Sequence, residues 1–135
     1  MSGLSIEVSI ITPEQRVFEG KADYLVVTAY DGEMAILPGH APIVVTLGIG
    51  PLRVEKGKET TRLAVRKGFI EFGNNCANVL VTEALKPEDI ELSDVERDLA
   101  ELAAPAVLND ADFAGALEGR AWAQTRMKVA GTPAV

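Results

Sequence analysis

The 135-residue sequence is poor in the residues that metal sites and covalent catalysts use most, with one cysteine, Cys76, and one histidine, His40. The chain can therefore form neither an internal disulfide nor a zinc site of Cys and His ligands, and no metal is expected. Long apolar runs and N-terminal targeting patterns are missing, so no membrane-spanning helix, signal peptide or transit peptide is expected. A glycine-rich phosphate-binding loop is also absent.

Positive charge is scarce as well, because 13 basic residues oppose 20 acidic ones and the formal net charge is -7. This balance opposes binding to the phosphates of nucleic acids or to anionic lipid, and it argues against a nucleic-acid partner. The charge is unevenly placed: residues 1–82 carry a net -1, residues 83–118 carry -9 and residues 119–135 carry +3. Two unlike modules are therefore expected.

Residues 1–87 are expected to form a β-sandwich domain. Short β-rich segments alternate with turn residues such as Asp31-Gly32, Lys67-Gly68 and Gly73-Asn74-Asn75. Several segments alternate apolar with polar residues, which predicts strands with one buried face. The pattern is typical of a small antiparallel sandwich. The expected strands span residues 4–11, 16–22, 23–29, 34–36, 43–47, 52–55, 62–66, 69–72 and 77–82.

Residues 88–135 are expected to form an antiparallel hairpin of two helices, which makes the fold mainly β with an α appendage. Ser93 and Glu96 have the spacing of a capping box at the start of the first helix. Pro105 indicates a break, and Asn109 is expected to cap the second helix. The predicted apolar stripes are Val95, Leu99, Leu102, Ala103 and Ala106 in the first helix and Phe113, Leu117, Ala121 and Gln124 in the second.

Two glycines weaken the second helix, since Gly115 and Gly119 each cost roughly 1 kcal/mol relative to alanine in a helix interior. Such a helix depends on docking, and docking can be reversible. Trp122 in this helix is either packed within the hairpin or, if exposed, an aromatic anchor for a partner. Basic residues in the segment 53–67 either form a solvated sheet face or attract an acidic partner.

Few residues suggest catalysis. Glu33 and His40 could act as an acid/base pair in a small hydrolase or isomerase, but no nucleophile or oxyanion motif accompanies them. The stiff segment around His40 is better interpreted as a structural or partner-contact loop. Cys76 has no identifiable base and resembles a small apolar residue. These residues predict no catalytic site, and a free ligand-binding sandwich is a further alternative.

Two segments carry a family resemblance: GEMAILPGHAP at residues 32–42 and GPLRV at residues 50–54. Further agreement comes from Ile11-Thr12-Pro13, Gly68-Phe69 and Val79-Leu80-Val81. On these motifs the chain resembles the epsilon subunit of bacterial and chloroplast F-type ATP synthases, over its whole length but less closely in the hairpin. The resemblance implies a β-sandwich followed by two helices and a non-catalytic subunit without a cofactor of its own.

The resemblance also implies partners. It suggests a rotor subunit of the central stalk whose sandwich binds the gamma subunit and rests on the c-ring, coupling ring rotation to ATP synthesis by the alpha and beta subunits. Glu33 aligns with a c-ring contact of the family. Pro38, Gly39, His40, Ala41 and Pro42 belong to the same partner-facing region of the family.

In this family the hairpin either lies folded on the sandwich or extends along gamma into the catalytic subunits, where it inhibits ATP hydrolysis. The resemblance therefore implies inhibitory contacts by the basic residues Arg120, Arg126 and Lys128. A coupling subunit would be inert alone and act only inside a complex, whereas an enzyme would keep its activity alone.

Some members of the family bind ATP on the folded hairpin as a regulatory ligand. By resemblance, the ATP contacts here would be Asp94, Arg97 and Arg126. Trp122 stands where nucleotide-binding relatives have an arginine, and the acidic surroundings would repel a triphosphate. The chain also departs from the family at Arg66-Lys67-Gly68, where a small residue and paired glycines are more usual.

The family resemblance places the chain on the cytoplasmic side of the bacterial plasma membrane, or on the stromal side of the chloroplast thylakoid membrane. Contact with the membrane is expected only through the assembled synthase, because the sequence has no basic amphipathic helix or anchor of its own.

Overall fold

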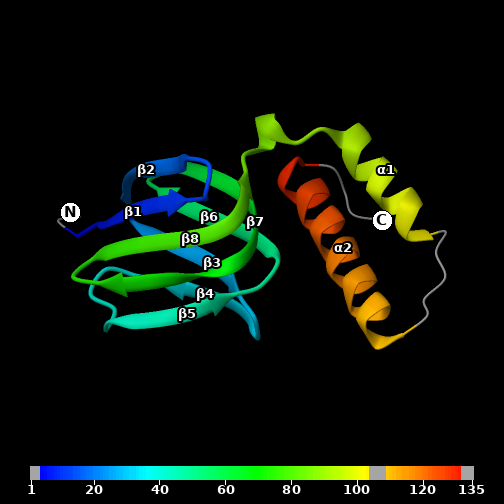
Figure 1. The fold of residues 1–135 in the computed structure, drawn as a ribbon. Coiled ribbons are helices and arrows are strands. Elements are labelled where there is room, and N and C mark those ends of the chain that lie inside the picture. Colours follow the sequence, from blue (N-terminus) through cyan, green and yellow to red (C-terminus); the bar gives the residue numbers. More distant parts are fainter. Residues whose placement is uncertain (1–3, 104–108, 132–135) are drawn as a thin grey trace.

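A computed structural model describes residues 4–103 and 109–131 of the chain. A β-sandwich of eight strands is followed by a short 3-10 helix and two helices that pack antiparallel to each other (Figure 1), which confirms the predicted fold class. Pro105 and Ala106, where a helix break and the end of an apolar stripe are predicted, lie outside the described residues. The elements are β1 (Ile6–Ile11), β2 (Arg16–Ala22), β3 (Tyr24–Ala29), β4 (Gly32–Ile36), β5 (Ile43–Leu47), β6 (Gly50–Lys56), β7 (Glu59–Gly73), β8 (Cys76–Leu85), η1 (Pro87–Asp89), α1 (Leu92–Ala103) and α2 (Asp110–Val129).

The strands form one continuous sheet, in the order β2-β1-β8-β7-β5-β3-β4, with β6 paired to both β3 and β7. Most neighbours are antiparallel, as predicted, but β1 runs parallel to β8, with Glu7 beside Cys76 and Ile11 beside Leu80. The alternation of apolar residues gives no information on strand direction, because it is the same in both directions. This parallel pair could therefore not be predicted from the pattern of either strand.

β7 is a single strand of 15 residues, where two strands separated by a turn at Lys67-Gly68 are predicted. Its first part pairs with β6 and its last part with β5, and the change of partner falls at Arg66 and Lys67. Lys67 has a φ of 53°, in the region that favours glycine. At Gly68 a Cβ atom would collide with the carbonyl oxygen of Leu80. The glycine is thus required by the close approach of β8 and not by a turn.

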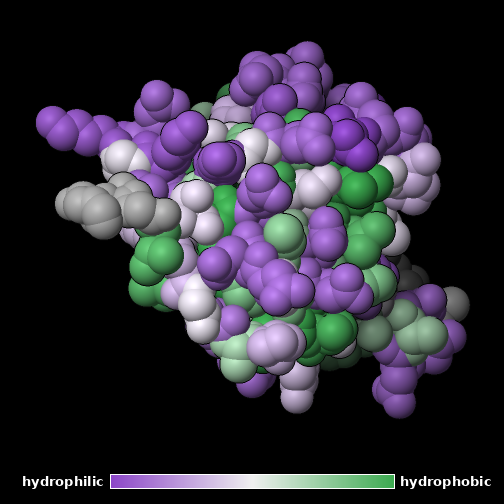
Figure 2. All heavy atoms as spheres, turned by 90° about the vertical axis from the view of Figure 1, so that its left-hand side faces the viewer, coloured by the Kyte–Doolittle hydropathy of each residue, from purple (hydrophilic) through white to green (hydrophobic). Residues whose placement is uncertain are grey.

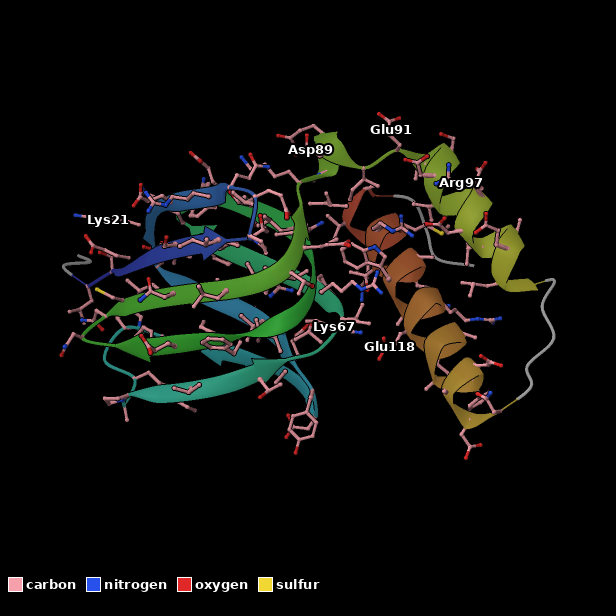
Figure 3. All side chains as sticks on the ribbon, in the orientation of Figure 1. Lys21, Lys67, Asp89, Glu91, Arg97 and Glu118 are labelled. Atoms are coloured by element: carbon pink, nitrogen blue, oxygen red, sulfur yellow. The ribbon has the colours of Figure 1, made fainter. Side chains whose placement is uncertain are left out.

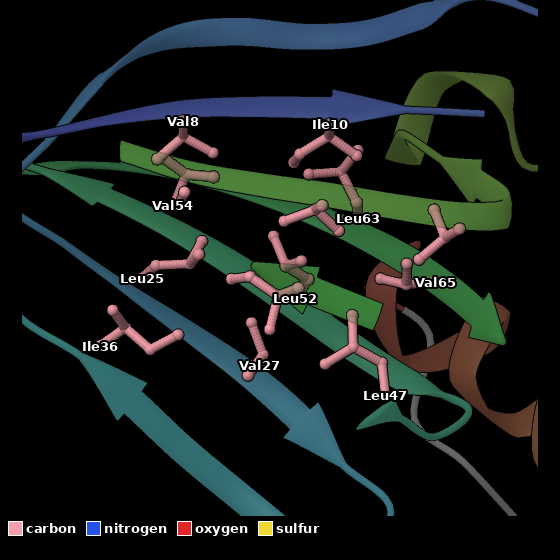
Figure 4. Close-up of a cluster of buried hydrophobic side chains, with 14 of the residues drawn as sticks. Val8, Ile10, Leu25, Val27, Ile36, Leu47, Leu52, Val54, Leu63 and Val65 are labelled. Atoms are coloured by element: carbon pink, nitrogen blue, oxygen red, sulfur yellow. The ribbon is translucent and has the colours of Figure 1, made fainter. Parts of the chain in front are cut away.

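The main core lies between the two layers of the sandwich (Figure 4). Each strand contributes inward-facing apolar residues, as the alternation predicts, and Ile6, Ile10, Leu25 and Leu63 are completely buried. Burying one such aliphatic side chain contributes roughly 1.5–3 kcal/mol. The core cluster contains residues of the strands only, so the sandwich has its own hydrophobic core.

A second, smaller cluster joins the hairpin to the sandwich. It contains Ala64 of β7, Ile90, Val95 of α1 and three residues of α2, Trp122, Ala123 and Val129. Ala64 lies on the outer face of β7 and is nevertheless fully buried. The hairpin is therefore folded against the outer face of the sheet, with α2 in contact with β6 and β7.

The docked face of α2 differs from the predicted stripe. Phe113 and Leu117 remain 55% and 53% exposed, whereas Trp122, Arg126 and Val129 face inward. Helical spacing shows which residues share a face, but it does not show which face docks. In α2 the docked face is the one with Trp122 and Val129, which cluster with Ala64 of β7. The stripe indicated by the spacing is therefore not the face of α2 that packs on the sheet.

The helix starts are predicted with mixed success. Asn109 caps α2, where its side-chain oxygen accepts a hydrogen bond of 2.8 Å from the backbone N–H of Asp112. Ser93 is not a cap, because α1 begins at Leu92 and the carbonyl of Glu91 accepts the N–H groups of Asp94 and Val95. The predicted capping box of Ser93 and Glu96 is therefore wrong, because Ser93 lies inside the first turn.

Candidate functional site

The loop Pro38 to Pro42 is fixed to the turn between β7 and β8. Gly39, with a φ of 84°, donates its backbone N–H to Asn75 Oδ1 at 2.7 Å. His40 Nδ1 donates to the carbonyl oxygen of Ala41 at 2.7 Å, and its ring meets the ring of Phe72 edge to face at 6.0 Å. The loop is exposed but its shape is set by the sandwich, so it can present a fixed surface to a partner. Figure 2 shows this end of the molecule, where apolar patches lie between hydrophilic side chains.

Glu33 lies at the other end of β4, at the start of that strand. Its exposed side chain lines two shallow hollows between the sandwich and α2, and Lys128 lines both of them. Thr28 and Gln124 line the first hollow, and Arg53 lines the second. Glu33 and the loop Pro38 to Pro42 thus occupy separate ends of the sandwich and do not form one patch.

The same separation speaks against an acid/base pair of Glu33 and His40. The length of β4 lies between them, and His40 is engaged by Ala41 and Phe72. In residues 4–103 and 109–131, no three His, Cys, Asp or Glu side chains are grouped so that they could hold a metal ion. The geometry therefore provides no catalytic arrangement for these two residues.

An apolar stripe crosses the outer face of the sheet and was not predicted. Phe69 of β7 pairs directly with Leu80 of β8, which pairs with Ile11 of β1. Phe69 is 42% exposed and Leu80 38% exposed, and Val44 of β5 adds a side chain that is 65% exposed. The available signal was that all of these residues occupy outward positions of alternating strands, where polar residues are the norm. We call Ile11, Val44, Phe69 and Leu80 the apolar stripe.

The basic residues of α2 differ in their accessibility. Arg120 and Lys128 are exposed. Arg126 is 8% exposed, and its Nη2 lies 2.9 Å from Asp98 Oδ2 of α1. This hydrogen bond from Arg126 is the main reason that the pKa of Asp98 lies below its usual value. In the folded hairpin, Arg126 is therefore committed to holding the two helices together.

The residues expected to contact ATP are not gathered in one site. Arg97 pairs with Asp94 at 3.4 Å and with Asp98 at 3.6 Å, on the exposed side of α1. A crevice of about 520 Å³ between the helices is lined by Arg126 but by neither Asp94 nor Arg97. Its lining includes the carboxylates Asp98, Glu101 and Asp112, which oppose a triphosphate.

Two contacts of charged side chains join the hairpin to β7, and a third lies beside them within α2. Lys67 Nζ lies 2.6 Å from Glu118 Oε2, and these side chains point toward each other in Figure 3. The guanidinium of Arg66 lies 5.6 Å from the centre of the Trp122 ring, and that of Arg126 lies 5.4 Å from it. The hydrogen bond from Lys67 lowers the pKa of Glu118 below its usual value. The segment Arg66-Lys67 thus adds polar contacts to the apolar cluster that joins the sandwich to the hairpin.

Comparisons with known proteins agree with this architecture. Residues 5–87 match the family model for the ATP synthase delta/epsilon chain, β-sandwich domain. The ATP synthase epsilon chain of Leptospira interrogans is 41% identical over 101 residues, which cover 75% of this chain and 80% of that one.

Two solved assemblies contain chains with the same fold. A chain in the mitochondrial ATP synthase of Euglena gracilis, solved as OSCP, F1 and c-ring, aligns with a TM-score of 0.75 and 19% identity over 96% of this chain and 83% of that one. A chain in the central stalk and c-ring of the Tetrahymena thermophila mitochondrial enzyme aligns with a TM-score of 0.69 and 14% identity over 93% of this chain and 96% of that one. On its sandwich match and its identity to bacterial relatives, the chain belongs to the family of ATP synthase epsilon chains, which are non-catalytic subunits.

Proposed function

We propose that the chain is a central-stalk rotor component of a bacterial ATP synthase, which couples rotation of the c-ring to ATP synthesis by the alpha and beta subunits. The observation that carries this proposal is the apolar stripe beside a fixed loop on a sandwich with its own core. Such a body transmits torque, because its two ends are joined by paired strands. The Tetrahymena chain with this fold belongs to a central stalk and c-ring assembly, which supports the same placement.

The gamma subunit is assigned to the apolar stripe and to the loop Pro38 to Pro42. Val44 follows this loop closely in the chain, so stripe and loop can form one interface. Exposed apolar side chains on neighbouring strands gain free energy when a partner removes them from water, about 25 cal/mol for each Å² buried. The c-ring is assigned to Glu33 at the other end of β4, so that the sandwich bridges ring and shaft.

The hairpin is assigned the role of a mobile inhibitor of ATP hydrolysis. Arg120 and Lys128 are already exposed, and Arg126 would be freed if the helices separated from each other and from the sandwich. Released basic side chains can then meet acidic loops of the beta subunit. The hairpin docks through a small apolar cluster, which suits an element that moves between two positions.

The location follows from this assembly. No helix among the described residues is both long and apolar enough to cross a bilayer. The chain would therefore be held at the cytoplasmic face of the plasma membrane by gamma and the c-ring, as a peripheral component. Washing at low ionic strength with a chelator should release it together with the catalytic subunits.

The test is a titration of a soluble complex of alpha, beta and gamma subunits that lacks epsilon. Binding and ATP hydrolysis are followed with the full chain and with residues 1–87, which retain the complete sandwich core. Binding by both, with inhibition by the full chain alone, is the expected result. If neither binds a closely matched complex, the rotor proposal fails; if both bind and neither inhibits, only the inhibitory role fails.

A pair of variants tests the assigned gamma interface. Phe69→Ser removes the central side chain of the apolar stripe and should weaken binding to the complex at least tenfold, because buried aromatic anchors dominate interfaces. Leu92→Ser is the matched control, since Leu92 is 41% exposed but lies at the start of α1, away from the stripe. Equal weakening by both variants would count against the assigned interface.

A further inference from the structure

We propose that Arg66 and Lys67 form a clamp on β7 that holds the hairpin folded on the sandwich without any bound ligand. The clamp grips α2 at two points, Glu118 and Trp122, which are one helical turn apart. Inside the complex the clamp would oppose extension of the hairpin, and this consequence rests on the proposed function. The clamp itself is a property of the isolated chain.

The backbone at Lys67 is the first argument. A φ of 53° is a backbone conformation that residues other than glycine adopt at a cost in free energy. The lysine side chain nevertheless reaches across to α2 and places its ammonium 2.6 Å from Glu118. Residues kept in an unfavourable conformation are expected where their side chain has a function, and the structure shows an ion pair with Glu118 for Lys67.

Arg66 is the second argument, because it begins a series of contacts that crosses both helices. Its guanidinium stacks on Trp122, whose other cationic neighbour is Arg126. Arg126 also donates a hydrogen bond to Asp98, which links α2 to α1. Movement of Arg66 relative to α2 would therefore disturb the packing of α2 on β7 and of α2 on α1.

The limited extent of the apolar docking makes the clamp matter. The buried residues of α2 all lie between Trp122 and Val129, in the C-terminal half of the helix. The N-terminal half exposes Phe113 and Leu117. The pair Lys67–Glu118 lies beyond the buried segment and attaches the helix where apolar packing has already ended.

The experiment measures amide hydrogen exchange of the full isolated chain by mass spectrometry, because exchange in α2 reports its opening equilibrium directly. We expect Lys67→Gln or Glu118→Gln to raise the opening equilibrium of residues 119–131 roughly two- to fivefold. Arg66→Gln should raise it by a similar factor. Protection of the strands in the main core should not change.

A charge exchange distinguishes an ion pair from a purely structural role of Lys67. Lys67→Glu alone should open α2 more than Lys67→Gln does, and adding Glu118→Lys should restore protection. Raising the salt concentration should reduce the difference between the wild-type chain and Glu118→Gln, because exposed ion pairs are screened. Glu118→Gln leaves β7 untouched, so it remains informative if a substitution at Lys67 impairs folding.

Arg16→Gln is the matched control, because Arg16 and Glu19 form an exposed ion pair of 3.2 Å within β2, which β1 and β8 separate from β7 in the sheet. It should leave exchange in α2 unchanged. The clamp is overturned if Glu118→Gln and Arg66→Gln change α2 no more than this control, or if the charge exchange restores nothing. Glu118→Gln can open α2 in the isolated chain and yet not deepen inhibition in the complex. In that case the inhibitory role fails and the clamp stands.

Discussion

Lys67 and Glu118 meet at 2.6 Å although one belongs to the longest strand of the sandwich and the other to the second helix of the hairpin. Their contact joins β7 to α2 four residues before Trp122, where the buried residues of the helix begin. Leu117, which directly precedes Glu118, and Phe113, more than one turn earlier, are left facing solvent. A polar contact is thus added to the apolar cluster around Trp122 where the hairpin meets the sheet.

Lys67→Gly should affect the two parts of the molecule differently. Glycine adopts a φ of 53° without strain, so the free energy of unfolding of the sandwich should change by no more than about 1 kcal/mol. The loss of the pair with Glu118 should still open α2 roughly two- to fivefold. Exchange of core amides and of α2 amides measures the two effects in one sample. A large, equal loss of protection in both parts would contradict this prediction.

Gly115→Ala should stabilise the chain. Outside its own helix backbone, no described residue has a heavy atom within 4 Å of a Cβ built at Gly115, so the substitution removes the conformational cost of glycine in a helix without a clash. We expect a gain of about 0.5–1 kcal/mol in the free energy of unfolding, measured by urea denaturation. Gly119→Ala is the comparison, because its Cβ would lie 3.2 Å from Leu102 Cδ2. It should gain less, and a larger gain than that of Gly115→Ala would be inconsistent with the packing.

Gly68→Ala should destabilise the sandwich by about 2–3 kcal/mol. A Cβ at this position would collide with the backbone of Leu80 and Val81, which cannot move without breaking the pairing of β7 with β8. Thermal and urea denaturation measure the effect. Gly73→Ala on the same strand is the control, since its nearest neighbour is Pro42 Cβ at 3.8 Å. Similar stability of both variants would show that β8 does not constrain Gly68.

Acid should loosen the hairpin. The pKa of Glu118 is lowered from its usual 4.5 by the hydrogen bond and charge of Lys67, with Arg66 contributing. This contribution to docking is complete above pH 4.5, where the undocked carboxyl is also ionised, and is lost as the pH falls through the lower pKa of the docked state. Trp122 is the only tryptophan, so its fluorescence follows docking. Glu118→Gln should lack this part of the transition, whereas Arg16→Gln should retain it.

ATP should not bind the isolated chain measurably at millimolar concentration. Arg97 and Arg126 both pair with Asp98, and two further carboxylates, Glu101 and Asp112, line the crevice between the helices. Isothermal titration calorimetry should therefore give no heat of binding. Saturable heat that disappears in Arg126→Gln would reverse this expectation and restore the ATP site implied by the family resemblance.

The sequence is sufficient for much of the sandwich, because alternation and turns act locally. β2 and β5 have the predicted bounds, and Asn109 caps α2 as expected. Local rules fail where a distant segment decides the conformation. Gly68 resembles a turn residue in the sequence, but its role is to let β8 approach.

The candidate site was predicted less completely than the fold. Glu33 and the loop Pro38 to Pro42 were identified by resemblance, but their positions at separate ends of β4 follow only from the strand pairing. The apolar stripe was missed because Phe69 and Leu80 come together across two strands. The docked face of α2 could not be chosen either, since the helix has two apolar faces and the surface of β7 selects between them.

The parallel pairing of β1 with β8 has a consequence for the order of folding. β1 can pair with β2 as soon as both have been synthesised, but its other edge stays open until residues 76–80 are available. During translation, an apolar strand edge near the N-terminus is therefore exposed while most of the sandwich is still being made, which invites pairing with other nascent chains. Closure of the sheet needs contacts between distant parts of the chain, so folding should be slow compared with that of a helical protein of the same length.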